Sequence, residues 1–66
     1  MVGARIKEYL QEHGIKQTFL AEKIDTTNSV MSDMLTGQRK ISCVEYYKIC
    51  MALGLPLDTF LKDETD

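Results

Sequence analysis

Apolar residues recur at intervals of three and four along most of this chain, and short polar or glycine-containing breaks divide them into five stretches. Such intervals place side chains on one face of an α-helix, whereas a strand needs an alternating pattern, which the chain lacks over any useful length. The pattern therefore predicts an all-α protein with five helices. We expect them at about Val2–His13, Gln17–Ile24, Asn28–Thr36, from the cap Ser42 to Leu53, and Leu57–Lys62.

Local signals support these boundaries. Thr27 and Ser42 stand directly before two of the predicted helices, where a hydroxyl oxygen accepts a hydrogen bond from an exposed backbone N–H. Glu45 lies three residues after Ser42, and the two residues together predict a capping box. Glycine ends helices readily, so all the glycines are interpreted as helix punctuation. They are Gly3, Gly14, Gly37 and Gly54.

On each predicted helix the apolar residues at helical spacing mark the side that should face the core. In the first three helices these residues are Ile6, Tyr9, Leu10, His13, Leu20, Ala21, Ile24, Met31, Met34 and Leu35. In the last two they are Val44, Tyr47, Ile49 or Cys50, Met51, Leu53, Leu57, Phe60 and Leu61.

Residues 17–36 have the layout of a helix-turn-helix, with two short helices joined by a polar turn of three residues. Helices that cross steeply need a small side chain at their contact, and Ala21 is placed for that role. The turn needs a left-handed residue, which Asp25 permits, although glycine adopts it more readily. The second helix would turn short polar side chains outward, and such side chains suit contact with base edges. They are Asn28, Ser29, Ser32 and Asp33.

Charge is distributed unevenly along the chain, whose net charge is −2 at pH 7. Residues 1–57 hold seven Lys or Arg and six Asp or Glu, whereas the last nine residues hold four acids against Lys62 alone. A net negative charge disfavours nucleic-acid binding, but a local basic patch on a near-neutral body can still contact phosphates. We expect one domain over residues 1–62 and an acidic, frayed tail over residues 63–66.

The residue types of the chain exclude several other classes of protein. Cys43 and Cys50 lie about 10 Å apart along a helix, too far for a disulfide, and two thiols with one histidine make no zinc pattern. No apolar run has the length of a membrane span, and charges such as Arg5 and Lys7 near the N-terminus argue against a secretory signal. No nucleophile–base pair or glycine-rich phosphate loop is present. We expect a cytoplasmic, non-enzymatic protein without a cofactor, a metal or a small-molecule substrate.

Five short motifs occur in one order and spacing along the chain. They are Gly14-Ile15-Lys16-Gln17, Leu20-Ala21-Glu22-Lys23-Ile24, Met31-Ser32, Leu35-Thr36-Gly37 and Leu53-Gly54-Leu55-Pro56-Leu57. In these motifs the chain resembles the Cro/C1-type helix-turn-helix regulators of phages and bacteria, over about Arg5–Leu61. The resemblance implies a five-helix bundle of the lambda-repressor-like type. It also implies sequence-specific binding to duplex DNA, often as a homodimer on a palindromic operator.

Site residues follow from the resemblance by position. The base-reading positions are those of Asn28, Ser29 and Asp33, with Ser32 nearby. The positions that hold phosphates are those of Gln17, Thr36, Arg39 and the Lys40 backbone N–H, and to these we add Lys48. Candidates for a dimer surface, which equally suit a lid over the core, are Leu55, Leu57, Phe60 and Leu61.

The chain departs from the family pattern at five positions. Lys16 stands where Ser or Thr usually caps the second helix, and lysine offers no acceptor. Asp25 replaces the turn glycine, and Asp33 places a carboxylate where it repels phosphate and accepts only from a donor such as the cytosine amino group. Leu10 and Leu35 replace an arginine and a glutamate that often pair in the family. An apolar pair can substitute for such an ion pair, so we expect Leu10 and Leu35 to touch.

These observations predict a DNA-binding transcriptional regulator, in the first place a repressor, that inserts the helix at residues 28–36 into the major groove. Two alternatives stay open at this point. One is a protein-interaction module of the same fold in which the acidic balance and Asp33 have removed DNA affinity. The other is the antitoxin of a toxin–antitoxin pair.

Overall fold

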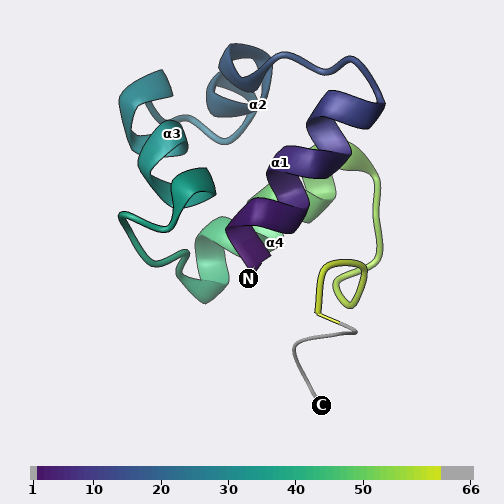
Figure 1. Cartoon of the computed structure of the whole chain (residues 1–66). Coiled ribbons are helices and arrows are strands. Elements are labelled where there is room, and N and C mark those ends of the chain that lie inside the picture. The colour runs from purple at the N-terminus through teal and green to yellow at the C-terminus, as the bar shows by residue number, and fades with distance from the viewer. Residues whose placement is uncertain (1, 62–66) are drawn as a thin grey trace.

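The computed structural model describes residues 2–61 and shows an all-α fold over that range. Its helices are α1 (Val2–Glu12), α2 (Gln17–Lys23), α3 (Asn28–Thr36) and α4 (Cys43–Leu53). Figure 1 shows α2 and α3 on the same side of α1. Helix α3 packs against both α1 and α2, and α2 also packs against α4. The all-α class and the first four helices are confirmed, with ends within one residue of those predicted.

The predicted fifth helix at Leu57–Lys62 is not found over its described part, since residues 57–61 form consecutive turns. The backbone N–H groups of Thr59 and Leu61 donate to carbonyls three residues back, on Pro56 and Asp58. The Tyr46 hydroxyl donates to the Leu57 carbonyl and accepts from the Phe60 N–H, so a side chain of α4 satisfies backbone groups that a helix would pair internally. Lys62 and the tail predicted at residues 63–66 lie outside the described residues.

Removing the Tyr46 hydroxyl tests how much its two hydrogen bonds stabilise these turns. We expect Tyr46→Phe to lower the free energy of unfolding by about 1 kcal/mol, the usual net contribution of an intramolecular hydrogen bond. Urea denaturation measures this change. Tyr47→Phe is the matched control, because the Tyr47 side chain is exposed. Equal stability of the two variants would show that the hydroxyl of Tyr46 contributes nothing to the fold.

The predicted caps and turn explain why the helices end where they do. The Thr27 hydroxyl accepts from the Val30 N–H at the start of α3, and Ser42 and Glu45 form the complete capping box of α4. Lys16 provides no side-chain cap for α2, as predicted. Asp25 has a φ of 60°, the left-handed conformation predicted for the turn between α2 and α3.

The core gathers apolar side chains from all four helices and from the turns after α4. Leu20 and Met31 are completely buried, and Ala21, the small residue predicted at the crossing of α2 and α3, is 2% exposed. Leu10 and Leu35 are both buried in this cluster, although their direct contact stays a prediction. His13, which has helical spacing, is instead exposed and stacks on the Tyr9 ring with a centroid distance of 4.1 Å. The buried hydrophobic residues are Ile6, Leu10, Leu20, Ala21, Ile24, Met31, Met34, Leu35, Ile49, Cys50 and Phe60.

Gly3 is a packing residue inside α1, so its interpretation as helix punctuation is wrong. It is buried, and a Cβ placed on it would lie 2.3 Å from the Met34 carbonyl oxygen and 3.3 Å from the Leu35 Cα. Only a residue without a side chain allows α1 to approach the backbone of α3 this closely.

The inward face predicted for α4 is also partly wrong. Val44, Tyr47 and Met51 are 64%, 52% and 54% exposed, while Ile49 and Cys50 are completely buried. Helix α4 carries apolar residues on nearly every side, so periodicity alone does not select its inner face. The face that packs inward follows the spacing i, i+3, i+4, i+7 and consists of Tyr46, Ile49, Cys50 and Leu53.

Candidate nucleic-acid interface

Helix α3 presents one polar surface, which we call the α3 face and define as Asn28, Ser29, Ser32 and Asp33. Met31, Met34 and Leu35 anchor the opposite side of α3 in the core. Because the anchors follow helical spacing, the polar residues before and between them turn outward: Asn28, Ser29 and Asp33 are exposed and Ser32 is half-buried. The predicted base-reading residues therefore lie together on one side of α3.

Gln17 and Asn28 link the first turns of the two helices. The Gln17 Nε2 donates to the Asn28 Oδ1 at 2.9 Å and to the Asn28 carbonyl oxygen at 3.4 Å. The Asn28 amide thus has one acceptor already occupied, and its two N–H donors remain for other partners. The sequence placed both residues in the site, but their contact was not predicted, because it joins positions eleven residues apart.

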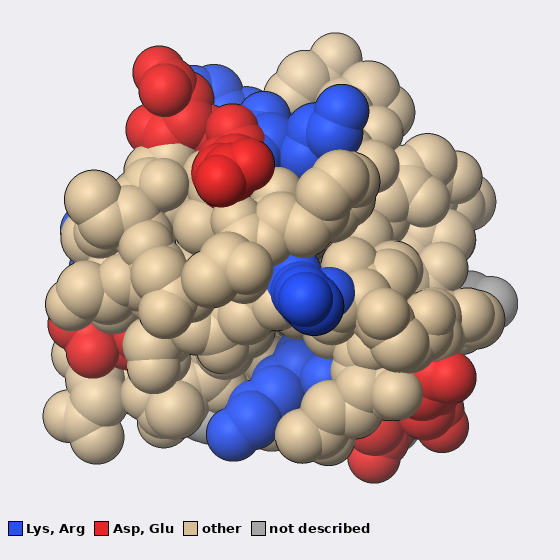
Figure 2. Space-filling view, turned by 90° about the horizontal axis from the view of Figure 1, so that it is seen from above, with Lys and Arg blue, Asp and Glu red and all other residues tan. Residues whose placement is uncertain are grey.

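Charged side chains of both signs lie at the surface. On the side of the molecule seen from above the view of Figure 1, Figure 2 shows Lys and Arg side chains near the middle and Asp and Glu side chains mostly toward the edges. Lys40 and Lys48 are both exposed. Lys48 lines a hollow together with Lys23 and Asp25 at the C-terminal end of α2. The predicted phosphate contacts are therefore spread over separate elements: Gln17 on α2, Thr36 on α3, Arg39 and Lys40 in the loop after α3, and Lys48 on α4.

Thr36, predicted to contact phosphate, is exposed, but its hydroxyl is engaged within α3. It donates to the Ser32 carbonyl at 2.9 Å and lies 3.4 Å from that of Asp33. A phosphate oxygen needs a donor, so this hydroxyl would have to leave the helix carbonyls before it could bind DNA.

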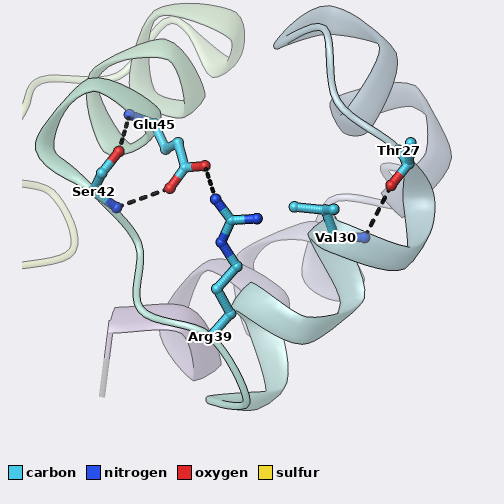
Figure 3. A network of polar contacts seen from close by, with 5 residues as sticks. All are labelled: Thr27, Val30, Arg39, Ser42 and Glu45. Carbon is cyan, nitrogen blue, oxygen red and sulfur yellow. Dashed lines mark hydrogen bonds and ion pairs between the residues drawn. The ribbon is translucent and has the colours of Figure 1, made fainter.

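Arg39 belongs to a network that sequence reasoning missed (Figure 3). Its Nη2 donates to the Glu45 Oε2 at 3.0 Å, and the other carboxylate oxygen of Glu45 accepts from the Ser42 N–H at 2.9 Å. One carboxylate therefore closes the capping box of α4 and fixes the arginine of the preceding loop. The capping box was predicted, but nothing in local spacing indicated that Arg39 would reach it.

The hydrogen bond from the Ser42 backbone N–H holds the pKa of Glu45 below its ordinary value of 4.5, and the Ser42 hydroxyl and the charges of Arg39 and Lys48 lower it further. Because the pKa is lowered by folding, the carboxylate stabilises the fold above pH 4.5. That contribution is lost as the pH falls through the lowered value.

Glu45→Gln tests this linkage. We expect the free energy of unfolding of the variant to be about 0.5 kcal/mol lower than that of wild type at neutral pH, because the charged cap and the ion pair are lost. The difference from wild type should shrink as the pH falls below 4.5. Thermal unfolding across pH measures both. Glu8→Gln, an exposed acid of α1, serves as the control, and a Glu45→Gln difference that does not change with pH would refute the assignment.

The four dimer candidates differ in accessibility. Phe60 is buried and packs edge-on against Tyr9 and Tyr46 at centroid distances of 5.8 and 6.4 Å, so it acts as part of the lid over the core. Leu57 is exposed, and Leu55 and Leu61 are half-buried. Of the four candidates, these three leucines are thus the ones with accessible surface.

Within residues 2–61, no helix is long and apolar enough to cross a membrane. The His, Cys, Asp and Glu side chains of that range form no group of three suited to a metal ion. Both cysteines are free, Cys50 in the core and Cys43 at the surface.

Comparison with known proteins was consistent with this geometry. The family model that describes the Cro/C1-type HTH DNA-binding domain matches residues 5–66. No curated protein and no solved structure matches the chain.

Proposed function

Because the chain belongs to the Cro/C1-type helix-turn-helix DNA-binding domain family, we propose that it is a transcriptional repressor that reads operator DNA with the α3 face. The observation that carries the proposal is the exposed first turn of α3, where Asn28 is held by Gln17 and keeps its N–H donors free. Short amide and hydroxyl side chains in this position suit the acceptors of the major groove.

The proposed base contacts come from Asn28, Ser29, Ser32 and Asp33. Asp33 is exposed, and an anion close to DNA selects a base that donates, such as cytosine through its amino group. Asp33 therefore narrows the choice of sequence while it lowers general affinity for phosphate.

The proposed phosphate contacts are few, which has a consequence for assembly. They are Gln17, Thr36, Arg39, Lys40 and Lys48. Among residues 2–61 no acceptor is bonded to the Lys40 backbone N–H, which leaves it for a phosphate. With so few cations one copy should bind weakly, so we propose a homodimer through Leu55, Leu57 and Leu61, on half-sites about 34 Å apart. The non-enzymatic function and the cytoplasmic location are part of the same proposal.

The decisive experiment selects bound duplexes from a random pool and then measures affinity for the selected sequence at several salt concentrations. We expect a preferred, palindromic sequence and a linear fall of log affinity with log salt concentration. Failure to select any sequence, or an affinity independent of salt, would leave the alternative of an interaction module that does not bind DNA.

Arg39→Ala is expected to weaken binding to selected and unselected sequences alike and to reduce the salt slope by about 1, because one phosphate contact is lost. Gel shifts with both kinds of duplex at two salt concentrations measure this. Arg5→Ala on α1 is the control. A loss confined to the selected sequence would instead assign Arg39 to base reading.

A further inference from the structure

Helix α4 exposes a row of large apolar side chains that the DNA-binding role does not use. We call Val44, Tyr47 and Met51 the α4 stripe; they follow the spacing i, i+3, i+7 and are 64%, 52% and 54% exposed. A single exposed apolar residue is ordinary, but a continuous row along one helix marks an interaction surface. Since the opposite side of α4 is packed in the core, the α4 stripe is a second apolar face of the same helix.

Two hollows flank the α4 stripe, and Tyr47 lines both of them. The first has a volume of about 680 Å³, and its apolar lining residues include Ile41 and Tyr46. The second, of about 380 Å³, includes Met51 and Ala52. Tyr47 therefore borders two neighbouring depressions, and a side chain in that position can pack into the groove of another helix.

The charges around the α4 stripe define the partner. Arg39 and Lys40 line the first hollow, Lys23 and Lys48 line the second, and among residues 2–61 Asp25 is the only acid that lines either. The Arg39 charge is shared with Glu45, which lies beside it. The described residues that flank the α4 stripe are thus mostly cationic, on a chain whose net charge is −2.

The arrangement of apolar and positively charged side chains indicates which kind of molecule can cover the α4 stripe. A second copy related by a two-fold axis through the α4 stripe would place the stripe against itself, and Lys23 and Lys48 of each copy would face those of the other. The proposed dimer surface meets this region only at the first hollow, which Leu57 and Leu61 also line. DNA would meet the cations but leave the apolar row in contact with water or phosphates. A helix with apolar residues on one side and carboxylates beside them satisfies both parts of the surface.

We infer that the α4 stripe binds an acidic amphipathic helix of a partner protein, whose apolar side chains cover Val44, Tyr47 and Met51 and whose carboxylates pair with the flanking cations. Three of these cations, Arg39, Lys40 and Lys48, are also proposed phosphate contacts. A partner on the α4 stripe therefore neutralises the residues that would hold DNA, and the two ligands should exclude each other.

The probe is a synthetic peptide of about fourteen residues, four helical turns, with leucine at the spacing i, i+3, i+4, i+7 and glutamate and alanine elsewhere. Its control carries lysine in place of each glutamate. Titration of the ¹⁵N-labelled chain followed by NMR should shift the amides of Val44, Tyr47 and Met51, and the lysine peptide should bind at least about tenfold more weakly.

Tyr47→Ser should weaken the glutamate peptide about tenfold or more, the effect expected of a central aromatic anchor. Phe19→Ser is the control, because Phe19 is 46% exposed on α2 and lines neither hollow. Both positions are at the surface, and circular dichroism confirms that the variants fold. Absence of peptide binding, equal binding of the two peptides, or shifts confined to other helices would overturn the inference. So would a dimer in sedimentation that Tyr47→Ser dissociates, since the occupant would then be a second copy.

Competition with DNA is a separate arm that rests on the proposed function. The glutamate peptide should displace a selected duplex, whereas the lysine peptide should not. A peptide that binds the α4 stripe without displacing the duplex would refute the shared use of Arg39, Lys40 and Lys48. If no duplex binds at all, the proposed function fails while the NMR titration still decides the inference.

Discussion

Gly3→Ala is expected to lower the free energy of unfolding by about 2–3 kcal/mol, the upper part of the range for overpacking a close contact. The added Cβ would lie 2.3 Å from the Met34 carbonyl oxygen and 3.3 Å from the Leu35 Cα. Both neighbours are backbone atoms of α3, so no side-chain rotation relieves the clash. Either α1 moves away from α3, which opens the core around Ile6, or its first turn unwinds.

The sign of this effect is informative because helix propensity opposes it. Alanine is about 0.8–1.0 kcal/mol more favourable than glycine in a helix interior, so an open position would be stabilised by the same change. In a domain of this size each kcal/mol shifts the melting temperature by about 4–8 °C. Chemical and thermal unfolding of Gly3→Ala therefore distinguish close packing from propensity.

The control for Gly3→Ala is the reverse change at the next position. Ala4 is exposed on the same turn of α1, and Ala4→Gly should lower stability by about 0.5–1 kcal/mol through propensity alone. A Gly3→Ala variant as stable as wild type, or more stable, would mean that α1 does not approach α3 as the structure shows.

Local rules were enough to predict most of the helical framework. The Thr27 cap, the Ser42–Glu45 capping box and the left-handed Asp25 each depend on residues within three or four positions of one another. The core side of α3 was also predictable, because its apolar residues occupy one face only. Such features are set by short-range hydrogen bonds and periodicity, which are visible in sequence order.

Contacts between distant residues account for what the sequence did not reveal. The exposed side of α4 depends on which of its two apolar faces meets the other helices, and the turns at residues 57–61 depend on the Tyr46 hydroxyl, which reaches them from α4. The packing role of Gly3 can be recognised only from the close approach of α1 to α3. Each of these outcomes is decided by tertiary packing, which overrides local preference.

In the candidate site, too, single residues could be predicted from the sequence, whereas contacts between distant residues could not. Sequence and resemblance selected Gln17, Asn28 and Arg39 individually. They did not indicate that Gln17 bonds to Asn28 or that Arg39 bonds to Glu45. These pairs matter because a bonded side chain presents its remaining donors in a fixed direction, and that direction determines which group on DNA it can meet.

Substitution of Gln17 and Asn28 separately and together should give a non-additive loss of DNA affinity, if the chain binds DNA as proposed. Asn28→Ala removes the proposed base contact and should weaken the selected duplex by about 1–3 kcal/mol, with little change for unselected DNA. Gln17→Ala should also weaken it, because the Asn28 amide then loses the bond of 2.9 Å that orients it.

In the double variant the second substitution should add little beyond the loss of the proposed phosphate contact of Gln17, since without Asn28 there is no amide left for Gln17 to orient. The expected coupling lies in the range of about 0.5–3 kcal/mol found for residues in contact, and gel shifts on selected and unselected duplexes measure it. Gln11→Ala, an exposed amide on α1, controls for loss of a glutamine as such. Additive penalties would mean that the two amides contact DNA independently. Equal losses of affinity for both duplexes would mean that Asn28 contacts the DNA backbone and that other residues of the α3 face read the bases.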